Sequence, residues 1–222
     1  MFKQYFKFIV RKLSRNRVYT VINIVGLSIA FSAAWLIYSH TANEWNNSDN
    51  IYRVITRYGD EDFWNCRTNT PFGPAAKRTF PEIVQVARYF QKDYRIKIED
   101  SQDFTIEPKL AFVDPPFFDL FEIPVIQGKI DTTVFSWIVF TETSAKRYFN
   151  KENPIGKTVT IKDGINNRKK DIKCQVVAVI KDFPANSTIQ ANIIVDYRQG
   201  APYFDEHRGN YSLYTYFHIL PT

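Results

Sequence analysis

The uncharged stretch from Val18 to Tyr38 constrains this chain most, because it has the length of a membrane span. Its sequence, VYTVINIVGLSIAFSAAWLIY, contains no Asp, Glu, Lys, Arg or His. A helix rises about 1.5 Å per residue, so this one would reach about 30 Å, the thickness of a bilayer's hydrocarbon core. We therefore predict a transmembrane helix over residues 18–40, with a short segment (1–17) before it and a large domain (41–222) after it.

Basic residues flank the predicted span on its N-terminal side. They are Lys3, Lys7, Arg11, Lys12, Arg15 and Arg17. No acid occurs before Glu44, so these six residues account for the whole formal net charge of +6. Short basic flanks stay in the cytoplasm, which predicts a cytoplasmic N-terminus and a large domain on the far side of the membrane. Because the domain itself is neutral, we do not expect nucleic acid as a partner.

The first 17 residues have the pattern of an amphipathic helix. Their apolar residues recur at helical spacing: Phe2, Tyr5, Phe6, Ile9, Val10 and Leu13. Lys3, Lys7 and Arg11 would form the opposite, basic face, which suits the anionic headgroups of membrane lipid. A disordered basic tail is the alternative.

A cleaved signal peptide is the main alternative for the start of the chain. Ser32 and Ala34 would supply the small residues of a cleavage site. The apolar run continues past them to Tyr38, and the basic segment is long and regularly amphipathic. We therefore expect an uncleaved span.

One face of the predicted span carries small and polar residues, namely Asn23, Gly26, Ala30 and Ala33. Small residues let helices approach closely in lipid, and Asn can hydrogen-bond across such a contact. We predict that this face packs against other transmembrane helices.

The domain alternates between strand patterns, turns and short helices. We expect strands near 51–58, 84–98, 104–106, 111–114, 136–140, 156–161, 173–180 and 211–220. Short helices are expected near 74–80, 117–121 and 141–149, with a cap at Thr141–Thr143. Gly128 and Gly156 are expected to permit turns. The fold class is therefore α+β: one N-terminal transmembrane helix followed by a mixed α+β domain.

The chain shows no pattern of a catalytic, cofactor or metal site. Gly156-Lys157-Thr158 resembles the end of a phosphate-binding loop, but position 151 is Lys151 and a strand pattern follows. The histidines His40, His207 and His218 lack metal-ligand spacing. We expect no enzymatic activity and no cofactor. Cys66 and Cys174 are compatible with a disulfide or with two thiols.

Several long segments, in a fixed order, resemble the N-terminal half of MacB/FtsX-like ABC-transporter permeases. The resemblance covers nearly the whole chain, and PIGKT and KDFPANS are its more specific parts. The segments are INIVGLSIA in the span, DNIYRV (Asp49–Val54), FVDPPFFDLFEIPVIQGK (Phe112–Lys129), IVFTETSAKRYFNKENPIGKTVTI (Ile138–Ile161) and VVAVIKDFPANSTIQ (Val176–Gln190).

The resemblance implies a permease subunit with a MacB-like periplasmic core domain. It implies a partner ATPase in the cytoplasm, a second permease copy in a dimer and, in some systems, a periplasmic adaptor protein. Such a subunit couples ATP hydrolysis in its partner to conformational change of the periplasmic domain, for transport or mechanotransmission. The domain would have two lobes, one inserted at about 117–170. The resemblance also implies the inner membrane, with the main domain in the periplasm. Three further transmembrane helices normally follow in such permeases, so we expect this chain to be a fragment or a designed truncation, with a naturally short protein as the alternative.

Two other classes of protein share this layout. The extracytoplasmic sensor domain of a membrane signalling protein would also have one N-terminal span and an α+β domain of this size. A membrane-anchored periplasmic binding protein would have the same span, together with a pocket lined by converging polar groups.

Overall fold

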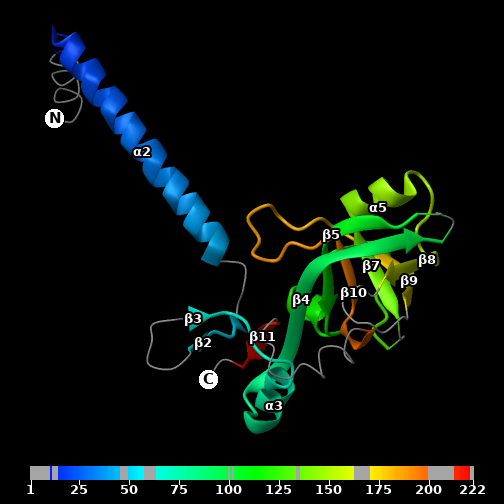
Figure 1. The fold of residues 1–222 in the computed structure, drawn as a ribbon. Helices are drawn as coiled ribbons and strands as arrows, with labels where there is room; N and C mark the ends of the chain where they lie inside the picture. Colours follow the sequence, from blue (N-terminus) through cyan, green and yellow to red (C-terminus); the bar gives the residue numbers. More distant parts are fainter. Residues whose placement is uncertain are drawn as a thin grey trace. The chain divides into compact units, whose positions relative to one another are not determined.

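The computed structural model describes residues 11, 15–45, 50–57, 64–99, 101, 103–133, 136–162, 171–199 and 213–220. Contacts between residues divide the chain into two compact units, residues 1–49 and residues 50–222. The first unit contains the long helix α2, and the second contains a large β-sheet with short helices (Figure 1).

Helix α2 (Arg17–Trp45) contains the apolar stretch that the sequence singles out. Within it, Arg17–Ser39 is long and apolar enough to cross a membrane, and it is the one such helix among the described residues. Its apolar side chains between Val18 and Tyr38 are exposed, as expected for a surface that faces lipid. The Ser28 and Ser32 hydroxyls donate to the carbonyls of Ile24 and Ser28, both at 2.8 Å. These two hydroxyls are therefore satisfied within the helix.

The second unit is built on a nine-stranded mixed sheet. Along its main path the strands are β1 (Ile51–Arg53), β11 (Tyr214–Ile219), β4 (Ile83–Ile98), β5 (Thr105–Val113), β10 (Ile193–Asp196), β7 (Trp137–Thr141), β9 (Ile172–Ile180) and β6 (Val125–Gly128). Strand β8 (Thr158–Lys162) pairs with both β4 and β9. A separate hairpin consists of β2 (Thr56–Arg57) and β3 (Trp64–Asn65). Parallel and antiparallel pairs occur together, which confirms the mixed α+β class.

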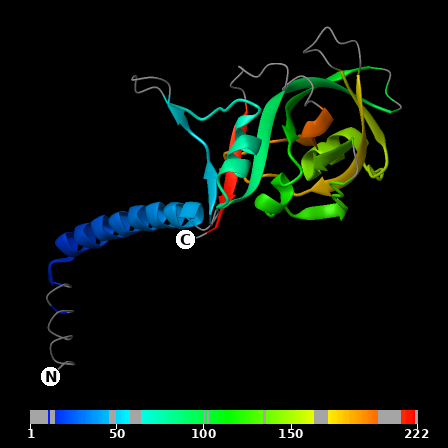
Figure 2. The ribbon, with the colours of Figure 1, turned by 90° about the horizontal axis from the view of Figure 1, so that it is seen from below.

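Six of these strands close into a ring, because β8 bridges two strands that lie far apart along the path. The pairings run β4–β5–β10–β7–β9–β8 and return to β4. Strand β4 makes this possible through its length: its first half pairs with β11 and its last residues pair with β8. A register irregularity at Lys92–Tyr94 accompanies its strong curvature (Figures 1 and 2).

The interior of the ring is a hydrophobic core to which every one of the six strands contributes. The contributing strand residues include Phe90, Ile96, Phe112, Ile138, Phe140, Val159, Ile161, Cys174, Val176, Ile193 and Val195. Helix α5 (Glu142–Phe149) adds Ala145 and Phe149 to the same core. The predicted cap of α5 is confirmed, since the Thr141 hydroxyl accepts a hydrogen bond from the Ser144 N–H at 3.4 Å.

A second core covers the outer face of the ring. Helix α4 (Phe117–Leu120), predicted from its phenylalanines, packs Phe117 and Phe118 there. Phe118 meets Trp137 edge-on, with ring centroids 5.4 Å apart. Helix α3 (Phe72–Thr79) lies over β4 and β11 and belongs to a third, smaller core.

Some predicted elements differ in detail from those observed. The single strand expected at 51–58 is two short strands, β1 and β2, separated at Val54, whose N–H donates to the Thr215 carbonyl at 2.9 Å. The expected strands at 104–106 and 111–114 are one strand, β5. Strands β6 and β10 were not predicted. The inserted lobe at about 117–170 remains a prediction; β6, β7 and β8 from this region are hydrogen-bonded into the common sheet.

Candidate functional site

The four residues predicted to pack against other helices lie along α2. Asn23, Gly26, Ala30 and Ala33 are all exposed, and successive turns bring them onto one face. A Cβ added at Gly26 would meet no described atom within 4 Å. The face is therefore open to a neighbouring helix, and its packing role remains a prediction.

The predicted interfacial basic face lies mostly outside the described residues. Lys3 and Lys7 belong to that part of the chain, whereas Arg11 is described, helical and exposed. Lipid contact by this segment remains a prediction.

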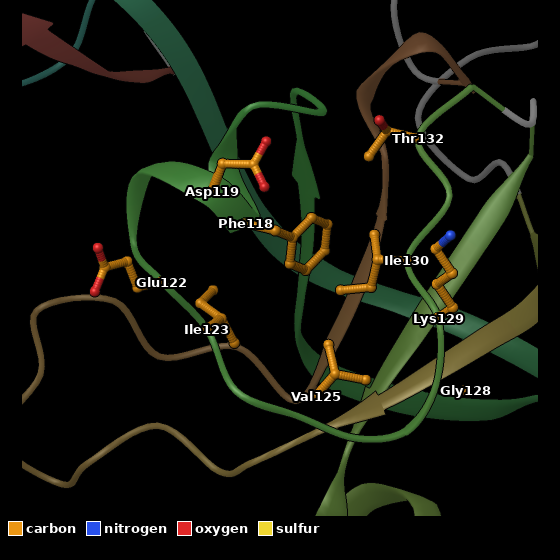
Figure 3. Close-up of a pocket in the computed structure, with 9 residues that line it drawn as sticks. All are labelled: Phe118, Asp119, Glu122, Ile123, Val125, Gly128, Lys129, Ile130 and Thr132. Atoms are coloured by element: carbon orange, nitrogen blue, oxygen red, sulfur yellow. The ribbon is translucent and has the colours of Figure 1, made fainter.

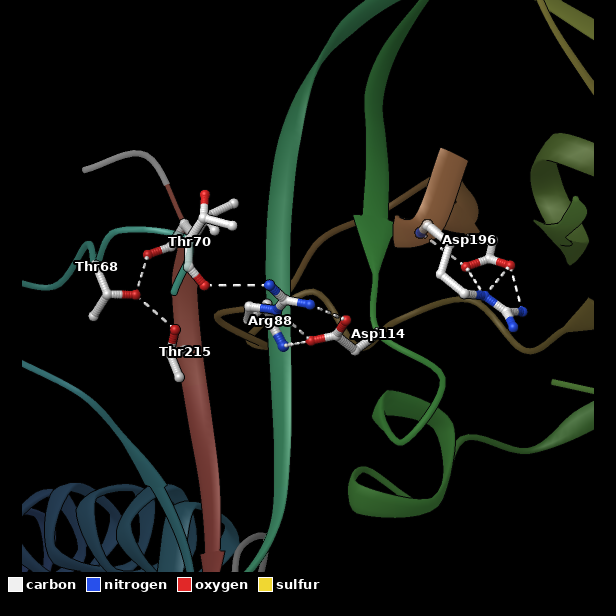
Figure 4. A network of polar contacts seen from close by, with 8 residues as sticks. Thr68, Thr70, Arg88, Asp114, Asp196 and Thr215 are labelled. Atoms are coloured by element: carbon white, nitrogen blue, oxygen red, sulfur yellow. Dashed lines mark hydrogen bonds and ion pairs between the residues drawn. The ribbon is translucent and has the colours of Figure 1, made fainter. Parts of the chain in front are cut away.

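Arg88 is the centre of a polar network that joins three segments of the domain (Figure 4). Its Nε and Nη2 atoms donate to the two carboxylate oxygens of Asp114 at 2.7 and 2.9 Å, and Nη1 donates to the Thr70 carbonyl at 3.2 Å. The guanidinium also lies 4.0 Å from the centre of the Tyr197 ring. The side chains of Arg88 and Asp114 are only 15% and 13% exposed. Strand β4 is thus fixed to the end of β5 and to the segment before α3.

Two further pairs of polar side chains form contacts of their own (Figure 4). The Thr68 and Thr215 hydroxyls are 2.6 Å apart and buried. The fully buried Asp196 carboxylate accepts from Arg198, which raises the pKa of that guanidinium. Arg198 in turn donates to the Thr132 carbonyl at 2.9 Å. These contacts link segments that lie far apart in the sequence, Thr68 with Thr215 and Arg198 with Thr132.

A buried carboxylate holds α5 against the sheet. Glu107 of β5 is fully buried and accepts from the Asn192 amide at 2.8 Å. Arg147 and Tyr148 of α5 both hydrogen-bond to its other oxygen. Burial raises the pKa of Tyr148, against the opposing charge of Arg147.

A cavity of about 660 Å³ opens between α4 and the segment that contains β6 (Figure 3). Its apolar lining consists of Phe118, Ile123, Val125 and Ile130. Charged and polar side chains line it as well, namely Asp119, Glu122, Lys129 and Thr132. The volume falls within the range of about 300–1,000 Å³ that is typical of small-molecule sites.

One wall of the cavity contains a glycine with a left-handed backbone conformation, Gly128 at the end of β6. Gly128 has a φ of +79°, and a Cβ there would lie far inside contact distance of the Val177 carbonyl oxygen. The predicted turn at Gly156 is confirmed, with a φ of +88°, whereas Gly128 has the positive φ but is the last residue of strand β6 and pairs with Ala178. After Gly156 the chain enters strand β8 rather than a helix, so the geometry of a phosphate-binding loop is absent at this position.

Among the described residues, no group of three or more His, Cys, Asp or Glu side chains could hold a metal ion. Cys66 and Cys174 are both free thiols. Burial, together with the negative charge of Asp196, raises the pKa of the Cys174 thiol to about 12.

The two cysteines should therefore differ in reactivity. In the folded chain at pH 8, a maleimide should modify the half-buried Cys66 at least about tenfold faster than Cys174, which lies inside the ring. Mass spectrometry after timed labelling would measure both rates, and urea should bring them together. Equal rates in the folded chain would contradict the burial of Cys174.

The sequence did not reveal the Arg88–Asp114 pair or the cavity. Asp114 precedes Pro115–Pro116 and Arg88 lies within a strand pattern, so nothing local links the two residues. The cavity depends on the pairing of β6 with β9, which is equally non-local.

A family model described as MacB-like periplasmic core domain matches residues 20–218 of the chain. A search of curated proteins gives no match.

Three solved structures share the fold. A permease-protein domain from Porphyromonas gingivalis has a TM-score of 0.62 and 18% identity, covering 78% of this chain and 76% of that one. The periplasmic region of MacB from Actinobacillus actinomycetemcomitans has a TM-score of 0.53 and 16% identity, covering 78% and 75%. The extracellular domain of the noncanonic ABC-type transporter YknZ from Gram-positive bacteria has a TM-score of 0.54 and 14% identity, covering 78% and 85%.

Proposed function

Because the chain belongs to the family of MacB-like periplasmic core domains, we propose that it is the N-terminal part of an ABC-transporter permease subunit. The observation that carries the proposal is the extent of the family match. The match begins at residue 20, inside the apolar helix, and continues to residue 218 in the last strand. Helix and domain therefore match the family as one continuous unit.

In this proposal the chain transmits movement and catalyses no reaction. A partner ATPase in the cytoplasm binds and hydrolyses ATP, and the transmembrane helices of two permease copies change their arrangement. Helix α2 passes this change to the domain that follows it in sequence. The Arg88 and Glu107 networks support this role, because a domain fixed by buried polar contacts moves as a body instead of deforming.

We place the protein in the inner membrane with its N-terminus in the cytoplasm. The supporting observation is the run of basic residues before the span, which includes the exposed Arg11, Arg15 and Arg17. These residues would also contact anionic lipid headgroups. A periplasmic adaptor protein is a further proposed partner in systems that export their substrate across a second membrane.

Packing of α2 against other helices gives a direct mutational test. In the full-length permease, Gly26→Leu should weaken association of the two copies by about three- to tenfold while leaving membrane insertion unchanged, because the larger side chain keeps helices apart. Val21→Leu, on the opposite face of the same helix, is the matched control. Crosslinking yields in membranes would measure association, and equal yields for the two variants would return α2 to the role of a simple anchor.

Co-purification tests the proposed transporter class. The full-length permease, tagged and extracted from native membranes in mild detergent, should retain an ABC ATPase at a fixed ratio. Extraction of a properly folded permease with no ATPase, under conditions that preserve other ABC complexes, would overturn the proposal.

The cavity beside α4 supports a second candidate, a membrane-anchored periplasmic binding protein. Such a protein would bind its ligand and function without an ATPase. Deletion of the ATPase gene that lies nearest in the genome separates the two proposals. The same phenotype as deletion of this protein's own gene supports the permease, and the absence of that phenotype supports the binding protein.

A further inference from the structure

The walls of the cavity beside α4 are preformed. On one side, the Ile123 N–H donates to the Phe118 carbonyl at 3.2 Å and closes the turn that carries Asp119 and Glu122. On the other side, the Lys129 N–H donates to the Val177 carbonyl at 3.2 Å, directly after the left-handed Gly128. A ligand would therefore meet a site that requires little backbone ordering, which favours affinity.

The charged side chains of the cavity, in contrast, are available to a ligand. Asp119, Glu122 and Lys129 are exposed, and none of them forms an ion pair with another described residue. Asp119 lies on the α4 side and Lys129 on the β6 side, with apolar side chains between them, whereas the Glu122 carboxylate points away from these side chains (Figure 3). From the α4 side to the β6 side, the site thus presents first a negative charge, then apolar side chains, and then a positive charge.

We propose that this cavity binds a short zwitterionic apolar molecule, with the chemistry of a small hydrophobic peptide with free ends. The ammonium group of the ligand pairs with Asp119, and its carboxylate pairs with Lys129. Its apolar side chains cover Phe118, Val125 and Ile130. A ligand of single charge would leave one wall without a partner, whereas a zwitterion satisfies both.

The volume and the lining agree with this class of ligand. A cavity of about 660 Å³ holds a few amino-acid residues, and its apolar residues would otherwise remain open to water. The proposal rests on the permease function for its biological setting, since it names a substrate or effector class for that domain. Binding itself needs no ATPase, so the binding test below and the co-purification test can fail independently.

Equilibrium dialysis with radiolabelled trileucine tests the proposal on the 222-residue chain in lipid nanodiscs, with empty nanodiscs subtracted. Three probes are compared: trileucine with free ends, N-acetyl-trileucine and trileucine amide. Trileucine should bind saturably and tightest. Each blocked peptide should bind about two- to fivefold more weakly, the effect of one exposed ion pair.

Variants then assign each end of the ligand to one wall. Lys129→Ala should weaken the binding of trileucine by the same factor and leave the binding of trileucine amide unaffected, because the amide has no carboxylate. Asp119→Asn combined with Glu122→Gln, which removes both negative charges of the α4 side, should weaken the binding of trileucine. The same double variant should leave the binding of N-acetyl-trileucine unaffected. Lys151→Ala and Asp93→Asn, at exposed positions away from the cavity, are controls for net charge.

Thermal unfolding should be the same for all these variants, since the replaced side chains are exposed. Saturable binding with the crossed pattern of losses supports the proposal. Absence of saturable trileucine binding, or equal losses for all three peptides in each variant, would overturn it.

Discussion

Replacement of Arg88 by Met should destabilise the domain by about 3–5 kcal/mol, the cost of leaving one member of a buried ion pair alone. Met keeps much of the apolar stem of Arg88 but removes the donors to both Asp114 oxygens and to the Thr70 carbonyl. The Asp114 carboxylate, 13% exposed, would lose its cationic partner and keep only the hydrogen bond from the backbone N–H of residue 88, at 2.9 Å. Urea unfolding of the full chain in detergent, followed by near-ultraviolet circular dichroism, would measure the change.

Two further variants show whether the effect comes from the ion pair. Arg95→Met removes an exposed arginine from the same strand and should change the free energy of unfolding by less than about 0.5 kcal/mol. Arg88→Met combined with Asp114→Asn should recover part of the loss, because no charge is then buried alone. A loss for Arg88→Met no greater than for Arg95→Met would contradict the central role of this pair.

Replacement of Gly128 by Ala should destabilise the domain by about 2–6 kcal/mol, from two costs that add. The φ of +79° is strained for any residue with a Cβ, at about 1–3 kcal/mol. The new methyl group would also collide with the Val177 carbonyl oxygen and lie only 2.9 Å from Ile155 Cδ1 and 3.0 Å from Ala178 Cα. Such overpacking costs a further 1–3 kcal/mol or so.

Gly156→Ala is the matched control for Gly128→Ala. Gly156 has a similar φ of +88°, but a Cβ there meets nothing within 4 Å. Only the strain should remain, so thermal unfolding should show a clearly smaller loss for Gly156→Ala. Equal losses would mean that backbone strain alone accounts for the requirement at Gly128, and the close packing of β6 on β9 would then lose its support.

Local sequence patterns predicted the elements whose signals lie within a few residues. The uncharged run gave α2, the phenylalanines after Pro115–Pro116 gave α4, and the Thr141 cap gave α5. The turn at Gly156 was also predicted, because glycine adopts a positive φ without steric cost. Each of these depends on short-range sterics or on hydrophobicity.

The parts that were missed depend on contacts between distant residues. Closure of the ring requires β8 to pair with the end of β4, which lies more than 60 residues earlier in the sequence. Strand β10 has only four residues, too few to show a period, yet it occupies the centre of the sheet between β5 and β7. The Arg88–Asp114 pair depends on the pairing of β4 with β5, and the cavity depends on the pairing of β6 with β9, so neither could be read from local patterns.

The family match gives the domain a setting that its own chemistry does not reveal. Arg88 and Glu107 hold segments of the domain together, and the residues around α4 and β6 line a cavity. This arrangement suits a part that receives motion from the membrane and presents a surface to a ligand. The proposed function therefore depends on coupling between two permease copies and a partner ATPase.

The central claim is that ATP binding in the partner ATPase changes the separation of the two periplasmic domains. Pulsed electron paramagnetic resonance measures it directly, with a spin label at Lys151→Cys, an exposed position after α5, in full-length permease carrying Cys66→Ser. Buried Cys174 should remain unlabelled. In the complex with its ATPase, ATP should shift the distance between labels on the two copies. An unchanged distance in a complex that hydrolyses ATP would contradict the account.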